Sequence, residues 1–147
     1  MPVIPEIPDP YLGTVLNDRY RIQHKIGAGG MGAVYLAEHV VIERKVAIKI
    51  LSQDFATKAD LVQRFIQEAR AAARIGHENI VEVYDFGETA SGSVFFAMEY
   101  LDGRDLASLI QQKGGLQASQ VKSIVSQICK ALWAAHSKQI VHRDLKP

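Results

Sequence analysis

The sequence has little of three features that would direct its interpretation at once: cysteine, charge of one sign and long apolar runs. A single cysteine, Cys129, among 147 residues excludes an internal disulfide and a cysteine-based zinc site. Lys and Arg total 17 against 16 Asp and Glu, and because the signs are interspersed, no basic stripe indicates nucleic acid or an anionic membrane. No apolar run approaches the ~18 residues that a membrane span requires. Partners must therefore be inferred from individual sites.

The start of the sequence also lacks the basic segment of a secretory signal peptide. Together with the lone cysteine, which suits a reducing compartment, this favours a cytoplasmic location. A membrane anchor beyond Pro147 in a longer parent protein would be compatible with the same residues.

The amount of apolar material is enough for one packed domain, because 48% of the residues are hydrophobic. Prolines punctuate the start of the chain, at Pro2, Pro5, Pro8 and Pro10. Proline fixes φ and removes a backbone donor, so we expect residues 1–12 to form an extended tail with little packing. The folded part is predicted to begin at residue 13.

The segment richest in glycine covers residues 26–35, where Gly27, Gly29 and Gly32 form the pattern G-x-G-x-x-G. Glycine lacks Cβ and lets backbone N–H groups approach a phosphate closely. A dinucleotide-binding fold opens a helix after this pattern, whereas a kinase loop returns into a strand. Apolar residues alternate on both sides of the glycines, at Tyr20, Ile22, Ile26, Val34 and Leu36. The alternation predicts a hairpin with the glycines at its tip, and a plain glycine-rich hairpin stays the alternative at this point.

A second strand pattern covers residues 44–51 and contains a lysine, Lys49. Alternation places Val46, Ile48 and Ile50 on one face of that strand and Lys49 on the other. A lysine in a strand is most often solvated, and that interpretation stays open beside a functional one.

From residue 58 to residue 75 the apolar period becomes helical, and Gly76 stands where a left-handed residue would end the helix. One face of this helix carries Leu61, Phe65, Glu68 and Ala72. Glu68 is then a carboxylate on the inward-facing stripe. It is either an edge acid that reaches water or an inward acid paired with a cation, and Lys49 is the obvious cation.

The remaining predicted elements are two short strands, at residues 81–86 and 93–99, a short helix that ends near Gly114, and a long helix at residues 117–137. The long helix has a wide apolar face, which needs a partner. The sequence closes with residues 140–147, which read Ile-Val-His-Arg-Asp-Leu-Lys-Pro.

Four features follow one another along the sequence: the glycine pattern, the strand motif Val46-Ala47-Ile48-Lys49, the helical Glu68 and the triplet His142-Arg143-Asp144. In that order they resemble the protein kinase family, and the resemblance runs from about residue 13 to residue 147. Lys146, just after Asp144, resembles serine/threonine rather than tyrosine kinases. The run Gly29-Gly30-Met31-Gly32 and the pair Arg19-Tyr20 resemble the bacterial members.

The resemblance implies an α+β fold of the protein-kinase type. Residues 13–98 would form an N-terminal lobe, an antiparallel sheet with one helix. Residues 99–147 would form the hinge and the first helices of an incomplete C-terminal lobe that ends in the catalytic loop.

The resemblance also implies an ATP site in the N-terminal lobe and hinge. The residues that it assigns to this site are Ile26, Gly27, Ala28, Gly29, Gly30, Met31, Gly32, Val34, Ala47, Lys49, Met98, Glu99, Leu101 and Asp105. Lys49 would bind the α and β phosphates, Met98 would be the gatekeeper and Asp105 would bind the ribose. The backbone of Glu99 and Leu101 would hydrogen-bond the adenine.

The catalytic residues implied by the resemblance are Asp144, Lys146, Lys49 and Glu68. Asp144 would accept the proton of a substrate hydroxyl, Lys146 would steady the transferred phosphate, and Glu68 would hold Lys49 in place. The implied partners are ATP with Mg²⁺ and a protein substrate that carries a Ser or Thr hydroxyl.

The sequence departs from the family pattern in two places. Gln139 follows the long helix where the family often has glycine, which predicts strain at a left-handed position. The residues that hold Mg²⁺ in the family, an asparagine after His-Arg-Asp and the aspartate of D-F-G, do not occur within these 147 residues. We therefore assign no metal ligand in this chain and expect it to be inactive alone.

Three functions remain for the sequence at this stage. The first is a serine/threonine protein kinase, represented here by an incomplete catalytic domain. The alternative is a non-catalytic kinase-like module that binds nucleotide or a partner. A dinucleotide-dependent oxidoreductase is disfavoured, because a strand follows Gly32 and because Glu68 lies on a helix instead of ending a second strand.

Overall fold

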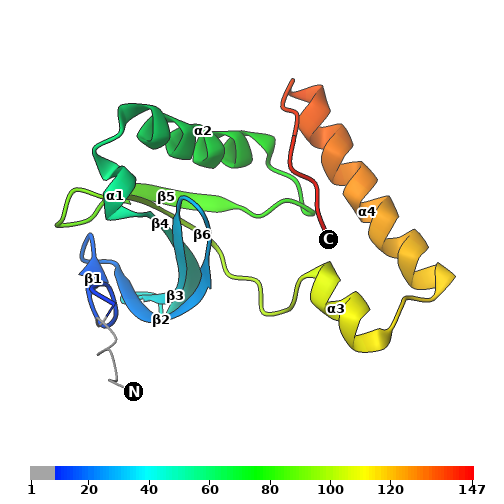
Figure 1. The fold of residues 1–147 in the computed structure, drawn as a ribbon, viewed down its shortest axis with the longest axis horizontal. Coiled ribbons are helices and arrows are strands. Elements are labelled where there is room, and N and C mark those ends of the chain that lie inside the picture. Colours follow the sequence, from blue (N-terminus) through cyan, green and yellow to red (C-terminus); the bar gives the residue numbers. More distant parts are fainter. Residues whose placement is uncertain (1–8) are drawn as a thin grey trace, which may run out of the picture.

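The computed structural model describes residues 9–147. Its N-terminal part, up to residue 99, is built on one antiparallel sheet (Figure 1). Its strands are β1 (Val15–Leu16), β2 (Tyr20–Ala28), β3 (Gly32–His39), β4 (Arg44–Leu51), β5 (Val83–Glu88) and β6 (Val94–Glu99). They lie in the order β1-β2-β3-β4-β6-β5. The hairpin predicted around the glycines is β2–β3, which confirms that a strand and not a helix follows Gly32.

Four helices complete the described part of the chain: α1 (Gln53–Ala56), α2 (Ala59–Ile75), α3 (Leu106–Lys113) and α4 (Ala118–Ser137). Figure 1 shows α2 lying across one face of the sheet, while α3 and α4 lie apart from it beyond the linker that follows β6. Gly76 ends α2 with φ +58°, the left-handed residue that the sequence predicted. Among residues 9–147, no helix is long and apolar enough to cross a membrane.

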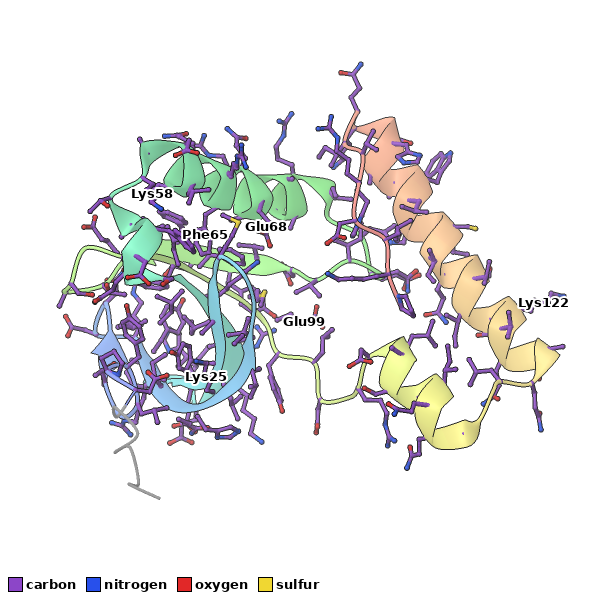
Figure 2. The ribbon with its side chains drawn as sticks, viewed as in Figure 1. Lys25, Lys58, Phe65, Glu68, Glu99 and Lys122 are labelled. Carbon is purple, nitrogen blue, oxygen red and sulfur yellow. The ribbon has the colours of Figure 1, made fainter. Side chains whose placement is uncertain are left out.

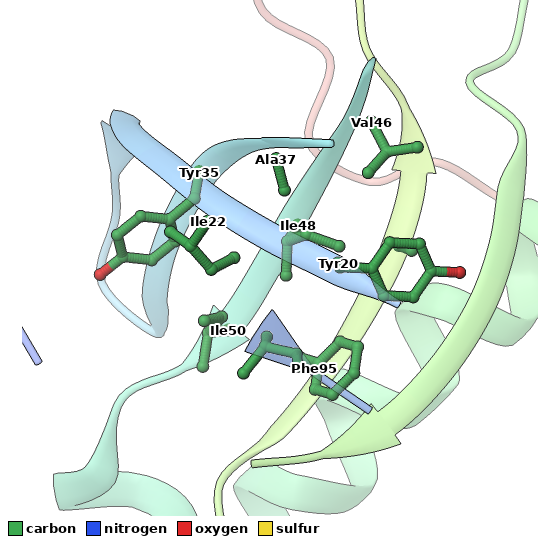
Figure 3. Packing of buried hydrophobic residues seen from close by; sticks show 10 residues of the cluster. Tyr20, Ile22, Tyr35, Ala37, Val46, Ile48, Ile50 and Phe95 are labelled. Carbon is green, nitrogen blue, oxygen red and sulfur yellow. The ribbon is translucent and has the colours of Figure 1, made fainter. Parts of the chain in front are cut away.

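The two faces of the sheet carry separate apolar clusters, because successive side chains of a strand point to opposite sides. Val46, Ile48 and Ile50 of β4 belong to the outer cluster, which also contains Tyr20, Ile22, Tyr35, Ala37 and Phe95 (Figure 3). The α2-side cluster consists of Leu51, Phe65, Ala69 and Phe96. The alternation predicted for β4 is confirmed, and it leaves Lys49 on the side of α2.

The packed part of the chain begins earlier than residue 13. Tyr11 packs against the outer cluster and meets the ring of Tyr35 edge-on, with 5.8 Å between the ring centroids. The Tyr35 hydroxyl donates to Asp9 Oδ2 at 2.7 Å. The predicted tail is therefore wrong for residues 9–12, because two aromatic rings offset the stiffness that Pro10 imposes. Residues 1–8 of the tail lie outside the described part.

Two further strands differ from the sequence prediction. Strand β1 is a two-residue strand that pairs with Arg21 and Tyr20, too short to give an alternating pattern. Strand β5 begins at Val83 instead of residue 81, and its register with β6 shifts between Val83 and Asp85. The first strand is too short for alternation to reveal, and the second difference comes with an irregular register, which local alternation does not record.

Helix α4 begins and ends with caps that its sequence explains. Gln117 and Gln120 form a reciprocal capping box at the start. At the end, Gln139 takes φ +60°, the left-handed conformation predicted for this position in spite of its side chain. Much of the apolar face predicted for α4 is exposed, including Val121, Val125 and Ile128.

Candidate functional site

The pairing of four strands places the candidate residues in rows across one face of the sheet. Gly27 pairs with Val34, Val34 with Lys49, and Lys49 with Phe96. Directly paired residues of an antiparallel sheet have side chains on the same face. This first row therefore joins the glycine segment to Lys49 through residues distant in sequence.

A second row runs beside the first, two residues along each strand. Leu36 pairs with Ala47, and Ala47 pairs with Met98. Ala47 is buried and its small side chain leaves space over the sheet. Ile26 falls at an irregularity of the β2–β3 register and is exposed at the edge of this face. The two rows thus place small and apolar side chains beside Lys49, as a planar apolar ligand requires.

The glycine loop between β2 and β3 is closed by backbone hydrogen bonds. After Ala28 ends β2, the Gly29 N–H donates to the Gly32 carbonyl oxygen at 2.9 Å, and the Met31 carbonyl accepts from Ser52 N–H at 2.9 Å. Gly30 has open space where a Cβ would lie. The Met31 side chain packs against the α2-side cluster. The loop is therefore held at its base, while its tip stays free to approach a ligand.

Lys49 and Glu68 form the ion pair predicted from the sequence, which confirms that prediction. Lys49 Nζ lies 2.5 Å from Glu68 Oε1, so the pair joins β4 to α2. The lysine nitrogen also lies 5.9 Å and 5.8 Å from the ring centroids of Phe65 and Phe96, within cation–π range. Figure 2 shows Phe65 and Glu68 on the side of α2 toward the sheet.

Glu68 is less buried than an acid on the inward stripe would be. Its side chain is 50% exposed, against 25% for Lys49, whereas Phe65 and Ala69 are buried. The buried stripe of α2 is therefore centred on Phe65 and Ala69, and Glu68 lies at its edge. Both interpretations of Glu68 from the sequence apply, because this acid at the edge of the stripe reaches water and is also paired with Lys49.

The linker after β6 contains the three candidate residues Glu99, Leu101 and Asp105. Glu99 N–H donates to the Glu82 carbonyl at 2.8 Å, so the start of the linker is tied to the segment before β5. Leu101 is exposed. Asp105 begins α3 as its N-cap, and its carboxylate accepts from Ser108 N at 2.6 Å and from Ser108 Oγ at 2.9 Å. These hydrogen bonds, the one from the Ser108 backbone foremost, lower the pKa of the Asp105 carboxyl.

The segment after α4 carries the remaining catalytic candidates. Lys146 Nζ lies 3.2 Å from Asp144 Oδ2, and both side chains are exposed. The Asp144 N–H donates to His142 Nδ1 at 3.3 Å, and Arg143 between them takes φ +64°. A non-glycine residue in that left-handed conformation turns the chain sharply just before Asp144.

The structure brings most predicted residues into one of two groups. The strand residues, the glycine loop and Glu68 surround Lys49, whereas Asp144 and Lys146 form their own pair. Sequence reasoning missed Phe96, which lies opposite Lys49 in the first row. The signal was present, because Phe96 precedes Met98 by one full strand repeat and so shares its face.

A metal site needs several oxygen, nitrogen or sulfur donors that converge. No group of three or more His, Cys, Asp or Glu side chains in residues 9–147 could hold a metal ion. The family generally uses Mg²⁺ together with ATP.

A curled antiparallel sheet crossed by one helix, a glycine loop at its edge and a lysine paired with a helix glutamate together define a lobe of the kinase type. The model of the protein kinase domain matches residues 20–147, and the chain belongs to the protein kinase family. Members of this family are transferases, and their glycine pattern, strand lysine and His-Arg-Asp triplet recur here at the positions described above.

The relatives of the chain are bacterial serine/threonine kinases. It is 47% identical over 146 residues to the serine/threonine-protein kinase Pkn1 of Myxococcus xanthus, covering 99% of this chain and 20% of the relative. It is 43% identical over 136 residues to the serine/threonine-protein kinase PrkC of Bacillus subtilis, covering 92% of this chain and 21% of the relative. The chain thus spans about a fifth of the length of these relatives.

Solved structures with the same fold include the PknI kinase domain of Mycobacterium tuberculosis. That likeness has a TM-score of 0.75 and 34% identity, and covers 92% of this chain and 54% of the other. A second, the apo form of PpkA-294, gives a TM-score of 0.81 at 27% identity and covers 54% of that chain. The predicted α+β kinase fold is confirmed.

Proposed function

We propose that this chain forms the ATP-binding part of a serine/threonine protein kinase that transfers the ATP γ-phosphate to protein Ser or Thr hydroxyls. The Lys49–Glu68 pair carries the proposal, because a strand lysine held 2.5 Å from a helix carboxylate is fixed beside the glycine loop. A cation in that place neutralises phosphate charge without being free to move away. The lone cysteine and the need for ATP suit the cytoplasm.

Separate residues of the chain would bind the nucleotide and the substrate hydroxyl. Ala47 and Met98, with Ile26 and Val34, would enclose the adenine, and the backbone of Glu99 and Leu101 would hydrogen-bond it. The N–H groups of the glycine loop, residues 27–32, would lie over the phosphates. Asp105 would accept from the ribose with carboxylate lone pairs not used by Ser108.

In the transfer step Asp144 would orient the substrate hydroxyl and accept its proton. Lys146, 3.2 Å from Asp144, would place a second positive charge near the transferred phosphate. Such a step depends on positioning and charge neutralisation more than on covalent catalysis.

A second function is supported by one sequence observation: the asparagine after His-Arg-Asp and the D-F-G aspartate, which hold Mg²⁺ in the family, do not occur within these 147 residues. Without them, the isolated 147-residue chain would bind ATP without transferring its phosphate, as a nucleotide-binding or partner-binding module does. Two assays on the isolated chain test its nucleotide site and its phosphate transfer in turn.

The first assay measures ATP binding to the isolated chain by calorimetry. We expect Lys49→Met to weaken binding by about tenfold or more, because a charge-assisted contact to phosphate is lost. Lys45→Met, a change of the same kind at an exposed position of β4, is the matched control and should bind like the unaltered chain. Equal binding by Lys49→Met and the unaltered chain would overturn the nucleotide site.

The second assay adds ATP, Mg²⁺ and a generic Ser/Thr protein substrate, and compares the chain with Asp144→Asn. We expect both to give only background phosphate transfer. Turnover that disappears in Asp144→Asn would show that the isolated chain is catalytic and that the metal is held without the expected ligands.

A further inference from the structure

Lys138, the residue that follows α4, reaches across to the end of α2. Its Nζ donates to the carbonyl oxygens of Arg74 at 2.5 Å and of Ile75 at 2.9 Å. The last carbonyls of a helix have no partner within the helix and carry partial negative charge. An ammonium group placed there stabilises the helix end by both hydrogen bonding and charge.

This contact joins two parts of the chain that share few others. Helix α2 is anchored to the sheet by Phe65 and Ala69, which lie in the α2-side cluster. A second side-chain hydrogen bond between these parts within residues 9–147 runs from Asn79 Nδ2 to Gln127 Oε1, at 3.2 Å. The C-terminal end of α2, beyond Ala69, is thus also held from the side of α4.

The backbone around Lys138 fixes the direction from which it acts. Lys138 N–H and Ile140 N–H both donate to the Ala135 carbonyl, each at 3.0 Å. Gln139 between them is left-handed, so the chain turns back toward α2. Ile140 then lines a shallow groove with Ala71 and Arg74 of α2, and the same segment continues to Asp144.

The distance along α2 from this contact to Glu68 is short. Ile75 lies seven positions after Glu68, which amounts to about 10 Å along the helix axis. A rigid helix that swings at its C-terminal end would displace Glu68 as well. Lys138, which caps α2, therefore influences the position of Glu68, the carboxylate that holds Lys49.

We propose that Lys138 is a positioning residue, which clamps the end of α2 to the segment that carries Asp144 and so keeps Glu68 within reach of Lys49. The inference rests on the proposed nucleotide site. It assigns the positioning of Glu68 to a residue that lies outside that site. Lys138 itself would contact neither ATP nor the hydroxyl.

Amide hydrogen exchange on the 147-residue chain tests the clamp without any assay of activity. We expect Lys138→Met to speed exchange in the last two turns of α2 by about tenfold or more, the effect of losing both hydrogen bonds from a charged group. Lys138→Arg should restore the slow rate to within about twofold, since a guanidinium also donates to carbonyls. Lys122→Met, at an exposed lysine of α4 (Figure 2), should change nothing.

Exchange in β2, β3 and β4 separates positioning from general loss of stability. It should stay unchanged in Lys138→Met, because those strands do not contact the clamp. Faster exchange in α2 and the strands alike would mean that Lys138 only stabilises the whole fold, and unchanged exchange in α2 would mean that it clamps nothing. Either result overturns the proposal.

A double-mutant cycle on ATP affinity then asks whether Lys138 acts through Glu68. We expect Lys138→Met to weaken ATP binding in the unaltered chain but to add less than about twofold when Glu68→Gln is already present. If the two substitutions weaken ATP binding independently, so that their fold-changes multiply, Lys138 does not act through Glu68 and the proposal is overturned. If the unaltered chain binds no ATP, the proposed function fails, while hydrogen exchange still decides whether the clamp exists.

Discussion

Gly32 approaches Ile50 so closely that no other residue fits between β3 and β4 at this point. A Cβ built on Gly32 would overlap the carbonyl oxygen of Ile50 and lie 3.0 Å from its carbonyl carbon. Both neighbours are backbone atoms of a paired strand, which cannot rotate away as a side chain would. The last glycine of the loop is therefore required by strand packing, whatever the ligand.

The first prediction follows from the difference between two glycines of that loop. Gly32→Ala should lower the melting temperature by several degrees and weaken ATP binding, because β3 must shift away from β4 next to Lys49. Gly30→Ala is the control, since a Cβ there meets nothing within 4 Å. Thermal melts and ATP titrations of both variants provide the measurement. Equal losses in the two variants would contradict the packing argument.

A second prediction separates the binding role of the Lys49–Glu68 pair from its contribution to stability. Because Glu68 is 50% exposed, Glu68→Gln should change the free energy of unfolding by less than about 1 kcal/mol. ATP affinity should fall several-fold, since Lys49 loses the partner that orients it. Glu78→Gln removes the same charge from an exposed position and should leave both quantities unchanged. Denaturant titration and calorimetry measure them, and a large stability loss with normal ATP affinity would reverse the interpretation.

The third prediction concerns the exposed face of α4. Val121, Val125 and Ile128 are all more than a third exposed, and Trp133 is 74% exposed. Burying each large aliphatic side chain is worth about 1.5–3 kcal/mol, so the isolated chain should self-associate and α4 should exchange its amides faster than the sheet. Sedimentation should show less association for Val125→Lys than for Ser126→Lys, the same change one residue away. A monomeric chain with α4 as protected as the sheet would contradict this.

The fourth prediction is a pH dependence at the start of α3. Asp105 has a lowered pKa in the folded chain because Ser108 donates to its carboxylate. Its capping contribution is therefore complete above the unfolded value of about 4 and is lost as the pH falls through the lower folded value. Hydrogen exchange of α3 between about pH 5 and pH 2 should show this loss in the unaltered chain.

Two variants of Asp105 complete that experiment. Asp105→Asn keeps an oxygen acceptor without a charge, so its α3 should respond less to pH. Asp105→Ala has no cap at any pH, and its α3 should exchange fast throughout. An α3 that responds to pH equally in the aspartate and asparagine chains would assign the effect to another acid.

Local sequence patterns sufficed for the elements that bear the site. The period of two around the glycines and through β4, and the change to a helical period before Gly76, each record which face of an element is buried. They predicted the hairpin, the side on which Lys49 lies and the Lys49–Glu68 pair. The resemblance to kinases predicted the order of the elements beyond the hinge. Hydrophobic periodicity alone does not predict that order.

Features set by contacts between distant residues were not predictable in the same way. Tyr11 packs on Tyr35 although prolines precede it, and Lys138 contacts α2 although more than sixty positions separate them in the sequence. Glu68 was placed on the inward stripe because a helical repeat locates a face only to within one residue. The neighbours of that residue, Phe65 and Ala69, decide where the buried stripe lies.

The strict alternation of β3 has a consequence for how this family member can change. Val34 and Leu36 lie in the two rows beside Lys49, while Tyr35 and Ala37 lie in the outer cluster. A one-residue insertion within β3 would exchange these two sets, placing a tyrosine where the nucleotide is expected and turning smaller aliphatic side chains toward the outer cluster. A substitution changes the side chains of one face only. A change in the length of β3 alters both faces at once. Variation in chain length is therefore expected at the turn between β3 and β4, and not within the strand itself.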